Sequence, residues 1–97
     1  MTDIRCEIRT RPSSNGLELI GLVWSDGPAA GRYDFTVNKD GPGGSSCTHQ
    51  SGFFTKQAHL PATVAIICVD AAMGSKYRAL LSVDVAGEEV ACSTSSA

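Results

Sequence analysis

The chain has 97 residues, a length that suits one domain with a single hydrophobic core. Its formal net charge is −2 and its charges are interspersed, so it lacks the basic run that would neutralise a row of phosphates, and we expect no nucleic-acid partner. No segment reaches the roughly 18 consecutive apolar residues that span a bilayer. The first residues, Met-Thr-Asp-Ile-Arg-Cys, lack the apolar core of a signal peptide, so if the protein is exported, its signal is missing from this sequence.

The first half of the chain opens with strand patterns. Residues 4–9 alternate apolar and polar side chains, as a strand does with one face on a core and one in water. After a turn-forming segment at 12–16, residues 17–24 are largely apolar on both parities, which predicts a central strand covered on both sides. We expect Trp24 in this strand to anchor the core. A turn at 25–28 ends the run.

The clearest strand spans residues 32–38, where alternation is cleanest. Its aromatic and aliphatic side chains are predicted to face the core, and its polar side chains to face water. The glycine- and serine-rich segment 39–46 has few side chains able to pack and predicts a turn or flexible loop. Two short edge strands are predicted at 47–50 and 53–56. The outward polar side chains of the central strand are Arg32, Asp34, Thr36 and Asn38.

The second half of the sequence predicts three more strands. One is predicted from its β-branched residues and another from alternation of inward and outward side chains. Helical periodicity is weak, and the best helical alternative is a single turn near residues 71–73 that Gly74 would end. The strands cover residues 62–69, 77–85 and the region around 90–92, with turns at 70–75 and 86–89 and a frayed tail at 93–97.

About seven short strands separated by turn signals every 8 to 12 residues are typical of an immunoglobulin-like antiparallel β-sandwich. The sequence therefore predicts an all-β fold of this class. No internal repeat and no low-complexity linker divides the chain. We expect one domain over residues 1–97.

The four cysteines are an even number in a short, glycine-rich chain, which favours two disulfides and an oxidising compartment over four free thiols. Four cysteines allow three pairings, and the sequence alone does not choose among them. Chain termini usually lie close together in sandwiches, which favours Cys6 with Cys92 and leaves Cys47 with Cys68. Four buried free cysteines are the alternative.

Signatures of metal binding and catalysis are weak or absent. Cys47 and His49, with His59 and Cys68 further on, invite a zinc interpretation, but zinc sites usually have two close pairs of ligands, and here the second pair is scattered. There is no Gly-x-Ser-x-Gly, His-Glu-x-x-His or P-loop motif. Adjacent carboxylates at Glu88-Glu89 fall in a turn, where successive side chains diverge. We expect no metal, no cofactor and no enzymatic activity.

A series of short motifs resembles a known family. They are a first-strand Cys-Glu-Ile-Arg, a Gly-Arg-Tyr-Asp-Phe-Thr-Val strand, Gly-Pro-Gly-Gly-Ser-Ser, Gln50-Ser51-Gly52-Phe53-Phe54, and the run from Tyr77-Arg78-Ala79-Leu80-Leu81 to Cys92. Together they are similar to the CsgH family of bacterial curli-assembly inhibitors, which is functionally related to CsgC. The resemblance extends from about Cys6 to Cys92, nearly the whole chain.

The resemblance implies a periplasmic immunoglobulin-like sandwich that stops the secreted curli subunit from forming amyloid before export. The terminal cysteines Cys6 and Cys92 match the family pattern, whereas Cys47 and Cys68 look like an addition. CsgC-type relatives carry a Cys-x-Cys that this sequence lacks, so the resemblance gives no ground for a redox role.

As a functional hypothesis, the polar face of the strand at 32–38 makes weak, transient contacts with the disordered curli major subunit. This face, formed by Arg32, Asp34, Thr36 and Asn38, is chosen because its inward neighbours are the best defined. We expect the protein to act as a monomer in the periplasm.

Two other functions compete with this hypothesis. The main alternative is a structural or adhesive sandwich module that binds a protein or a carbohydrate, which an exposed aromatic platform would favour. A secreted enzyme inhibitor inserting residues 41–46 is a third, but this segment lacks the large anchoring side chain in which binding energy tends to concentrate.

Overall fold

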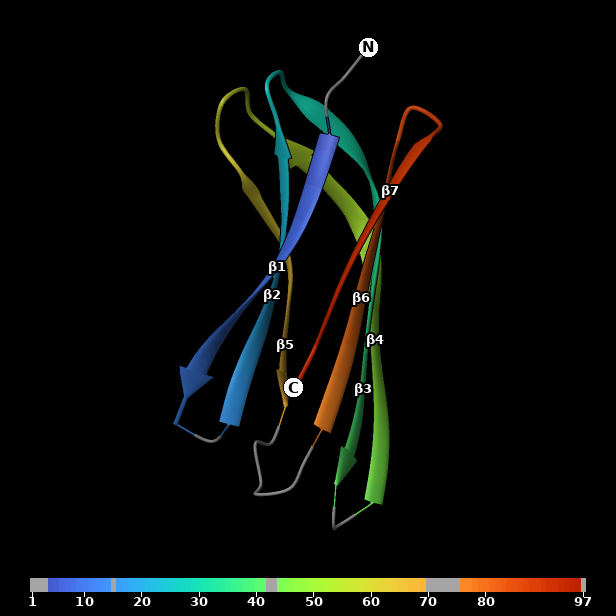
Figure 1. The fold of residues 1–97 in the computed structure, drawn as a ribbon. Coiled ribbons are helices and arrows are strands. Elements are labelled where there is room, and N and C mark those ends of the chain that lie inside the picture. Colours follow the sequence, from blue (N-terminus) through green and yellow to red (C-terminus); the bar gives the residue numbers. More distant parts are fainter. Residues whose placement is uncertain (1–3, 15, 42–43, 70–75, 97) are drawn as a thin grey trace.

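The computed structural model describes residues 4–14, 16–41, 44–69 and 76–96, and all regular secondary structure in these ranges is β-strand (Figure 1). The strands form two antiparallel sheets packed face to face, which confirms the predicted all-β sandwich. No helix in the described ranges is long and apolar enough to cross a membrane. The three-stranded sheet has the order β1 (Ile4–Ser13), β2 (Gly16–Ser25) and β5 (Ala62–Val69); the four-stranded sheet has the order β4 (Gly44–Lys56), β3 (Ala29–Gly41), β6 (Lys76–Val85) and β7 (Glu88–Ser95).

The core lies between the two sheets and is built from one parity of each strand. Phe35 and Val37 on β3, Leu81 and Val83 on β6 and Leu19 on β2 are fully buried there. Each such side chain stabilises the fold by about 1.5–3 kcal/mol relative to an exposed one. The inward parity predicted for the strand at 32–38 is therefore the observed one, and the strand predicted at 77–85 also buries one of its faces.

The two sheets are linked on both sides of the sandwich. On one side a disulfide between Cys6 on β1 and Cys92 on β7 joins the facing edge strands, with 5.9 Å between the two Cα atoms. On the other side the Gln50 side-chain amide on β4 donates a hydrogen bond to the Ile66 carbonyl on β5. Both sides of the core are thus fastened by a contact between sheets.

The second predicted disulfide, Cys47 with Cys68, is not formed, and both residues are exposed free thiols. Cys47 pairs in register with Asn38 on the outer surface of the four-stranded sheet, whereas Cys68 pairs with Glu18 on the outer surface of the three-stranded sheet. Side chains that leave a sandwich from opposite faces cannot be bridged without moving the backbone. That prediction was wrong because closeness of the chain ends says nothing about the remaining pair.

Trp24 does not anchor the core, contrary to the prediction. It is half-buried on the outer surface of the three-stranded sheet, where its indole Nε1 donates a 3.2 Å hydrogen bond to Glu7 Oε1. The guanidinium of Arg9 lies 5.8 Å from the centroid of the indole ring. β2 is the middle strand of its sheet, but only one of its faces is covered by the other sheet.

The segment predicted as a loop at 39–46 lies mostly in a long hairpin. β3 continues to Gly41, and β4 begins at Gly44 and runs without a break to Lys56, in place of two short strands. Ladder hydrogen bonds use only backbone groups, so a segment without packing side chains can still be a strand. Residues 42–43 lie outside the described ranges.

The chain end is also more regular than predicted. β7 begins at Glu88, inside the expected turn, and continues to Ser95, inside the expected frayed tail. The Ser96 backbone N–H then donates a 3.0 Å hydrogen bond to the Tyr77 carbonyl. The turn predicted at 70–75 and the helical alternative near 71–73 lie outside the described residues.

Candidate functional site

The candidate site is the outer face of the four-stranded sheet, formed by every second side chain of β4, β3, β6 and β7. The pairing register arranges these side chains in rows across the sheet. Three rows are Phe53-Arg32-Asp84-Glu89, Ser51-Asp34-Ser82-Ala91 and His49-Thr36-Leu80-Ser93, and the fourth is Cys47-Asn38-Arg78-Ser95.

The structure places all four residues of the predicted client-binding face together. Arg32, Asp34 and Asn38 are exposed and Thr36 is half-buried, and all four point away from the core on β3. β3 lies between β4 and β6, so these residues form one of the two central columns of the outer face. Their neighbours on both sides are therefore part of the same surface.

One end of the outer face carries mainly acidic groups. A shallow groove of about 170 Å³ is lined by Arg32, Asp34, Ser82, Asp84 and Glu89. Three carboxylates and one guanidinium thus line a site open to water. Such a surface attracts cationic or hydrogen-bond-donating groups of a partner through weak, screened interactions.

Phe53 stands next to this acidic groove and was not singled out from the sequence. Its side chain is 81% exposed, and the guanidinium of Arg32 lies 5.6 Å from the centroid of its ring. Its neighbour Phe54 is buried in the core. The sequence did contain a signal. Successive side chains of a strand point to opposite faces, so only one of two adjacent aromatic residues can face the core.

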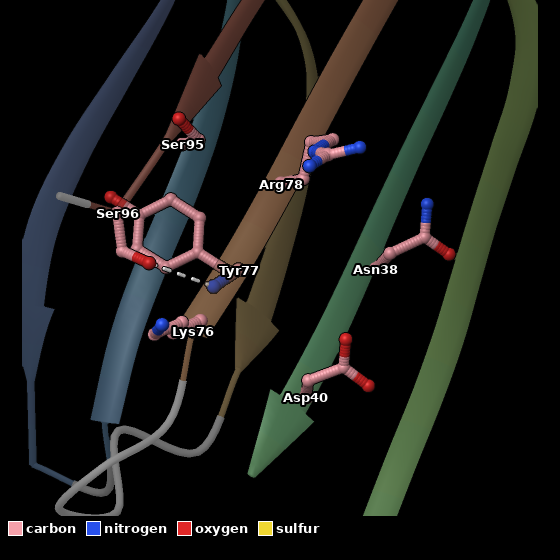
Figure 2. Close-up of a pocket in the computed structure, with 7 residues that line it drawn as sticks. All are labelled: Asn38, Asp40, Lys76, Tyr77, Arg78, Ser95 and Ser96. Carbon is pink, nitrogen blue, oxygen red and sulfur yellow. Dashed lines mark hydrogen bonds between the residues drawn. The ribbon is translucent and has the colours of Figure 1, made fainter.

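The other end of the outer face is richer in cations (Figure 2). Lys76 and Arg78 of β6 lie across from Asp40 of β3 in a groove of about 370 Å³. At the β7 side of this groove, the backbone N–H of Tyr77 donates a 3.0 Å hydrogen bond to Ser96 Oγ. The remaining lining residues are Asn38 and Ser95.

The chemistry of the outer face suits reversible binding. His49 Nε2 lies 3.3 Å from Asp34 Oδ1, the only pairing of a histidine ring with a carboxylate found in the described ranges. His59 lies in the exposed segment between β4 and β5 and is not part of this pair. The described ranges bring no three His, Cys, Asp or Glu side chains together as a metal-binding group. Isolated exposed ion pairs are worth about 0.2–1 kcal/mol each, so such a surface holds a partner weakly.

The outer face of the three-stranded sheet carries a second candidate surface around Trp24. A groove of about 430 Å³ is lined there by Arg5, Cys6, Glu7 and Trp24. The hydrogen bond from Arg9 lowers the pKa of Glu7 below its ordinary value, and the same bond raises the pKa of Arg9. The indole is therefore held at one edge by a charged carboxylate.

Known proteins share this architecture. The solution structure of CsgH from R. palustris matches with a TM-score of 0.80 and 28% sequence identity, over 94% of this chain and 90% of that one. The E. coli curli protein CsgC, at 15% identity, shares the fold with a TM-score of 0.75, over 96% of this chain and 97% of that one. No curated protein matches the chain significantly.

The comparison of the sequence with family profiles identifies the family. The profile of the CsgH family, described as CsgH protein, matches residues 5–95, from β1 to the end of β7. The matched region thus includes both cysteines of the disulfide and every strand that forms the two outer faces. With nearly the whole sandwich covered by the profile, this chain belongs to the CsgH family.

Proposed function

We propose that this protein is a periplasmic, chaperone-like inhibitor that delays aggregation of the curli major subunit through weak, transient contacts with the unfolded chain. The observation that carries the proposal is the open, mixed-charge outer face around Arg32 and Asp34, with a groove at each end. Family membership and the likeness to a curli protein support the same function. The protein acts in this proposal as a binding protein and not as an enzyme.

The physical basis is an accumulation of small contacts. Each exposed charge or hydrogen-bonding group contributes about 0.2–1 kcal/mol, so several together give affinities in the range of about 1 mM, which a disordered client can leave quickly. Such contacts weaken as salt is added, because exposed charges are screened within about 8 Å at physiological ionic strength. The disulfide suits the oxidising periplasm.

The test is a thioflavin-T time course of purified curli major subunit with this protein present well below one to one. The informative variant is Arg32→Glu with Asp34→Lys, which reverses the charges of these two residues and keeps the net charge. The matched control is Arg11→Glu with Glu18→Lys, which exchanges an ion pair on the other sheet. We expect wild type and the control to lengthen the lag, and the first variant to lose most of this effect.

Two results would contradict parts of the proposal. Full inhibition by the Arg32 and Asp34 variant would remove this face from the mechanism. An unchanged lag with wild-type protein, even at equal concentration, would overturn the inhibitor function itself. An unrelated disulfide-bonded sandwich serves as the protein control.

A structural or adhesive module is the second candidate function, and the surface position of Trp24 favours it. An aromatic ring beside a groove of about 430 Å³ is the kind of platform on which a sugar ring stacks. Titration of Trp24 fluorescence with monosaccharides and oligosaccharides tests it. Saturable quenching that Arg5→Ala weakens would support binding of a carbohydrate in this groove, and a flat titration would reject it.

A further inference from the structure

The first part of β4 is an unusually bare edge of the four-stranded sheet. Residues 44–49, which we call the β4 arm, are exposed on both parities. β3 pairs with the arm on one side, and no backbone hydrogen bond to another strand is present on its other side in the described ranges. In Figure 1 the arm is the outermost strand of its sheet, beside the end of β3.

The sequence of the β4 arm gives no protection to this edge. It is Gly-Ser-Ser-Cys-Thr-His, and from Gly44 to Thr55 the strand contains no lysine, arginine, aspartate, glutamate or proline. Edge strands of soluble proteins usually carry such residues, because they prevent pairing with a strand from another chain. The arm is therefore open to an added strand.

Each of the other edge strands is linked to the facing sheet, whereas the β4 arm carries no such disulfide or hydrogen bond in the described ranges. β1 carries charged side chains on its outer parity and Pro12, and its edge faces β7 across the disulfide. β5 has its Ile66 carbonyl occupied by the Gln50 side chain. The far end of β4 is closed by the segment after it, where the buried Lys56 ammonium donates to the Leu60 carbonyl at 2.9 Å.

We propose that the β4 arm is a docking strand, to which an extended, uncharged segment of a disordered client adds by backbone hydrogen bonding. Strand addition of this kind takes its affinity from main-chain hydrogen bonds and its selectivity from side chains. The inference rests on the proposed function and adds the mode by which the client is held.

The chemistry of the arm selects the occupant. Because the arm is exposed on both parities, both faces of an added strand also stay in water. An added strand with apolar side chains would leave apolar surface in water, which is unfavourable. A strand with small, polar, uncharged side chains has no such cost. The hydroxyls of Ser46 and Thr48 offer hydrogen bonds to such neighbours.

A second copy of this chain is a poorer occupant. Two arms paired with each other would join only six residues from each chain. Stable protein interfaces bury about 1,200–2,000 Å² in total, and a pair of short bare strands exposed on both faces buries far less. A disordered client needs no stable interface, because brief occupation of its free edge is enough to delay its pairing with another client.

The test combines a lysine variant with a matched control. Ser46→Lys with Thr48→Lys places two charges on the β4 arm, as protected edges do. Thr10→Lys with Ser14→Lys adds the same charge to exposed positions in and just after β1, an edge strand of the other sheet. Equal urea midpoints for the three proteins show that each is folded.

The first readout is binding of freshly prepared, monomeric curli major subunit, followed with its thioflavin-T lag. We expect the arm variant to bind about tenfold more weakly, because backbone hydrogen bonds to the added strand are lost. The arm variant therefore extends the thioflavin-T lag less than wild type, while the β1 control behaves as wild type. Wild-type binding and inhibition retained in the arm variant would overturn strand addition and leave the proposed function intact.

The second readout needs no variant. Amide hydrogen exchange of the wild-type protein, measured by NMR with and without the subunit, is expected to slow at residues 44–49 and to stay unchanged in β7. Unchanged exchange in the arm while the subunit is bound would overturn the inference. A wild-type dimer that the arm variant dissociates would assign the arm to self-association and overturn it too. A wild-type protein that neither binds nor inhibits the subunit would instead reject the proposed function.

Discussion

The Gln50 side chain of β4 donates its amide hydrogen to the Ile66 carbonyl of β5 over 3.1 Å, and so joins the two sheets on the side away from the disulfide. Gln50→Ala leaves this carbonyl without its partner, and we expect a loss of about 1 kcal/mol in the free energy of unfolding. Urea denaturation measures the loss. Gln57→Ala, in the exposed segment after β4, is the control, and an equal effect of both substitutions would contradict the role given to Gln50.

The disulfide between Cys6 and Cys92 closes a loop with a sequence separation of 86 residues. Replacing both cysteines by serine is expected to lower the free energy of unfolding by about 2–5 kcal/mol, because the unfolded chain regains the entropy of the open loop. The control replaces the exposed Cys47 and Cys68 by serine. Denaturation curves with and without reductant would contradict the prediction if the control lost as much stability as the terminal pair.

Gly31 is required by close packing of β3 against β6. A Cβ atom at this position would overlap the Asp84 carbonyl oxygen and lie 2.8 Å from Val85 Cγ2. We expect Gly31→Ala to destabilise the protein by about 1–3 kcal/mol, because backbone atoms must move to make room. Gly27→Ala has nothing within 4 Å of the added Cβ and serves as the control. Equal thermal midpoints for both variants would show that the strands do not approach so closely.

The contact of Glu7 with Arg9 and Trp24 predicts a pH-dependent signal. The hydrogen bond from Arg9, joined by that from Trp24, lowers the pKa of Glu7 below its ordinary 4.5. A carboxyl whose pKa is lowered by folding stabilises the folded state above its unfolded pKa, and the effect is lost as pH falls through the folded pKa. Fluorescence of Trp24, the single tryptophan, should therefore change below pH 4.5.

The variant Glu7→Gln removes the titrating group and keeps an acceptor for the indole. It is expected to flatten this transition, while Glu88→Gln on β7 leaves it unchanged. A wild-type transition centred above pH 4.5, or one that persists in Glu7→Gln, would contradict the assignment.

The strands at 32–38 and 77–85 could be predicted from the sequence because a single face of each is buried, so burial and alternation coincide. Trp24 could not be placed in this way. β2 is apolar on both parities, and the pattern does not show which face the other sheet covers. The position of Trp24 depends on the register with β1, which brings Glu7 and Arg9 to the same outer surface.

The predictions for the β4 arm and for the second cysteine pair were wrong for related reasons. Glycine and serine at 44–46 predict a loop when only side-chain packing is considered, but backbone bonds to β3 hold them in a strand. For Cys47 and Cys68, the question is which faces they occupy, and that depends on pairing between strands distant in sequence. The outward parity of Arg32 to Asn38 is local information, so the sequence alone could place these four side chains on one face.

The link between Cys6 and Cys92 makes almost the entire polypeptide a covalent ring. A single peptide-bond cleavage at any point between the two cysteines opens the ring and releases no fragment. Such a nicked molecule runs as one species under non-reducing conditions and as two after reduction. Its new ends lie wherever the cut was made, and the disulfide still holds the two pieces together.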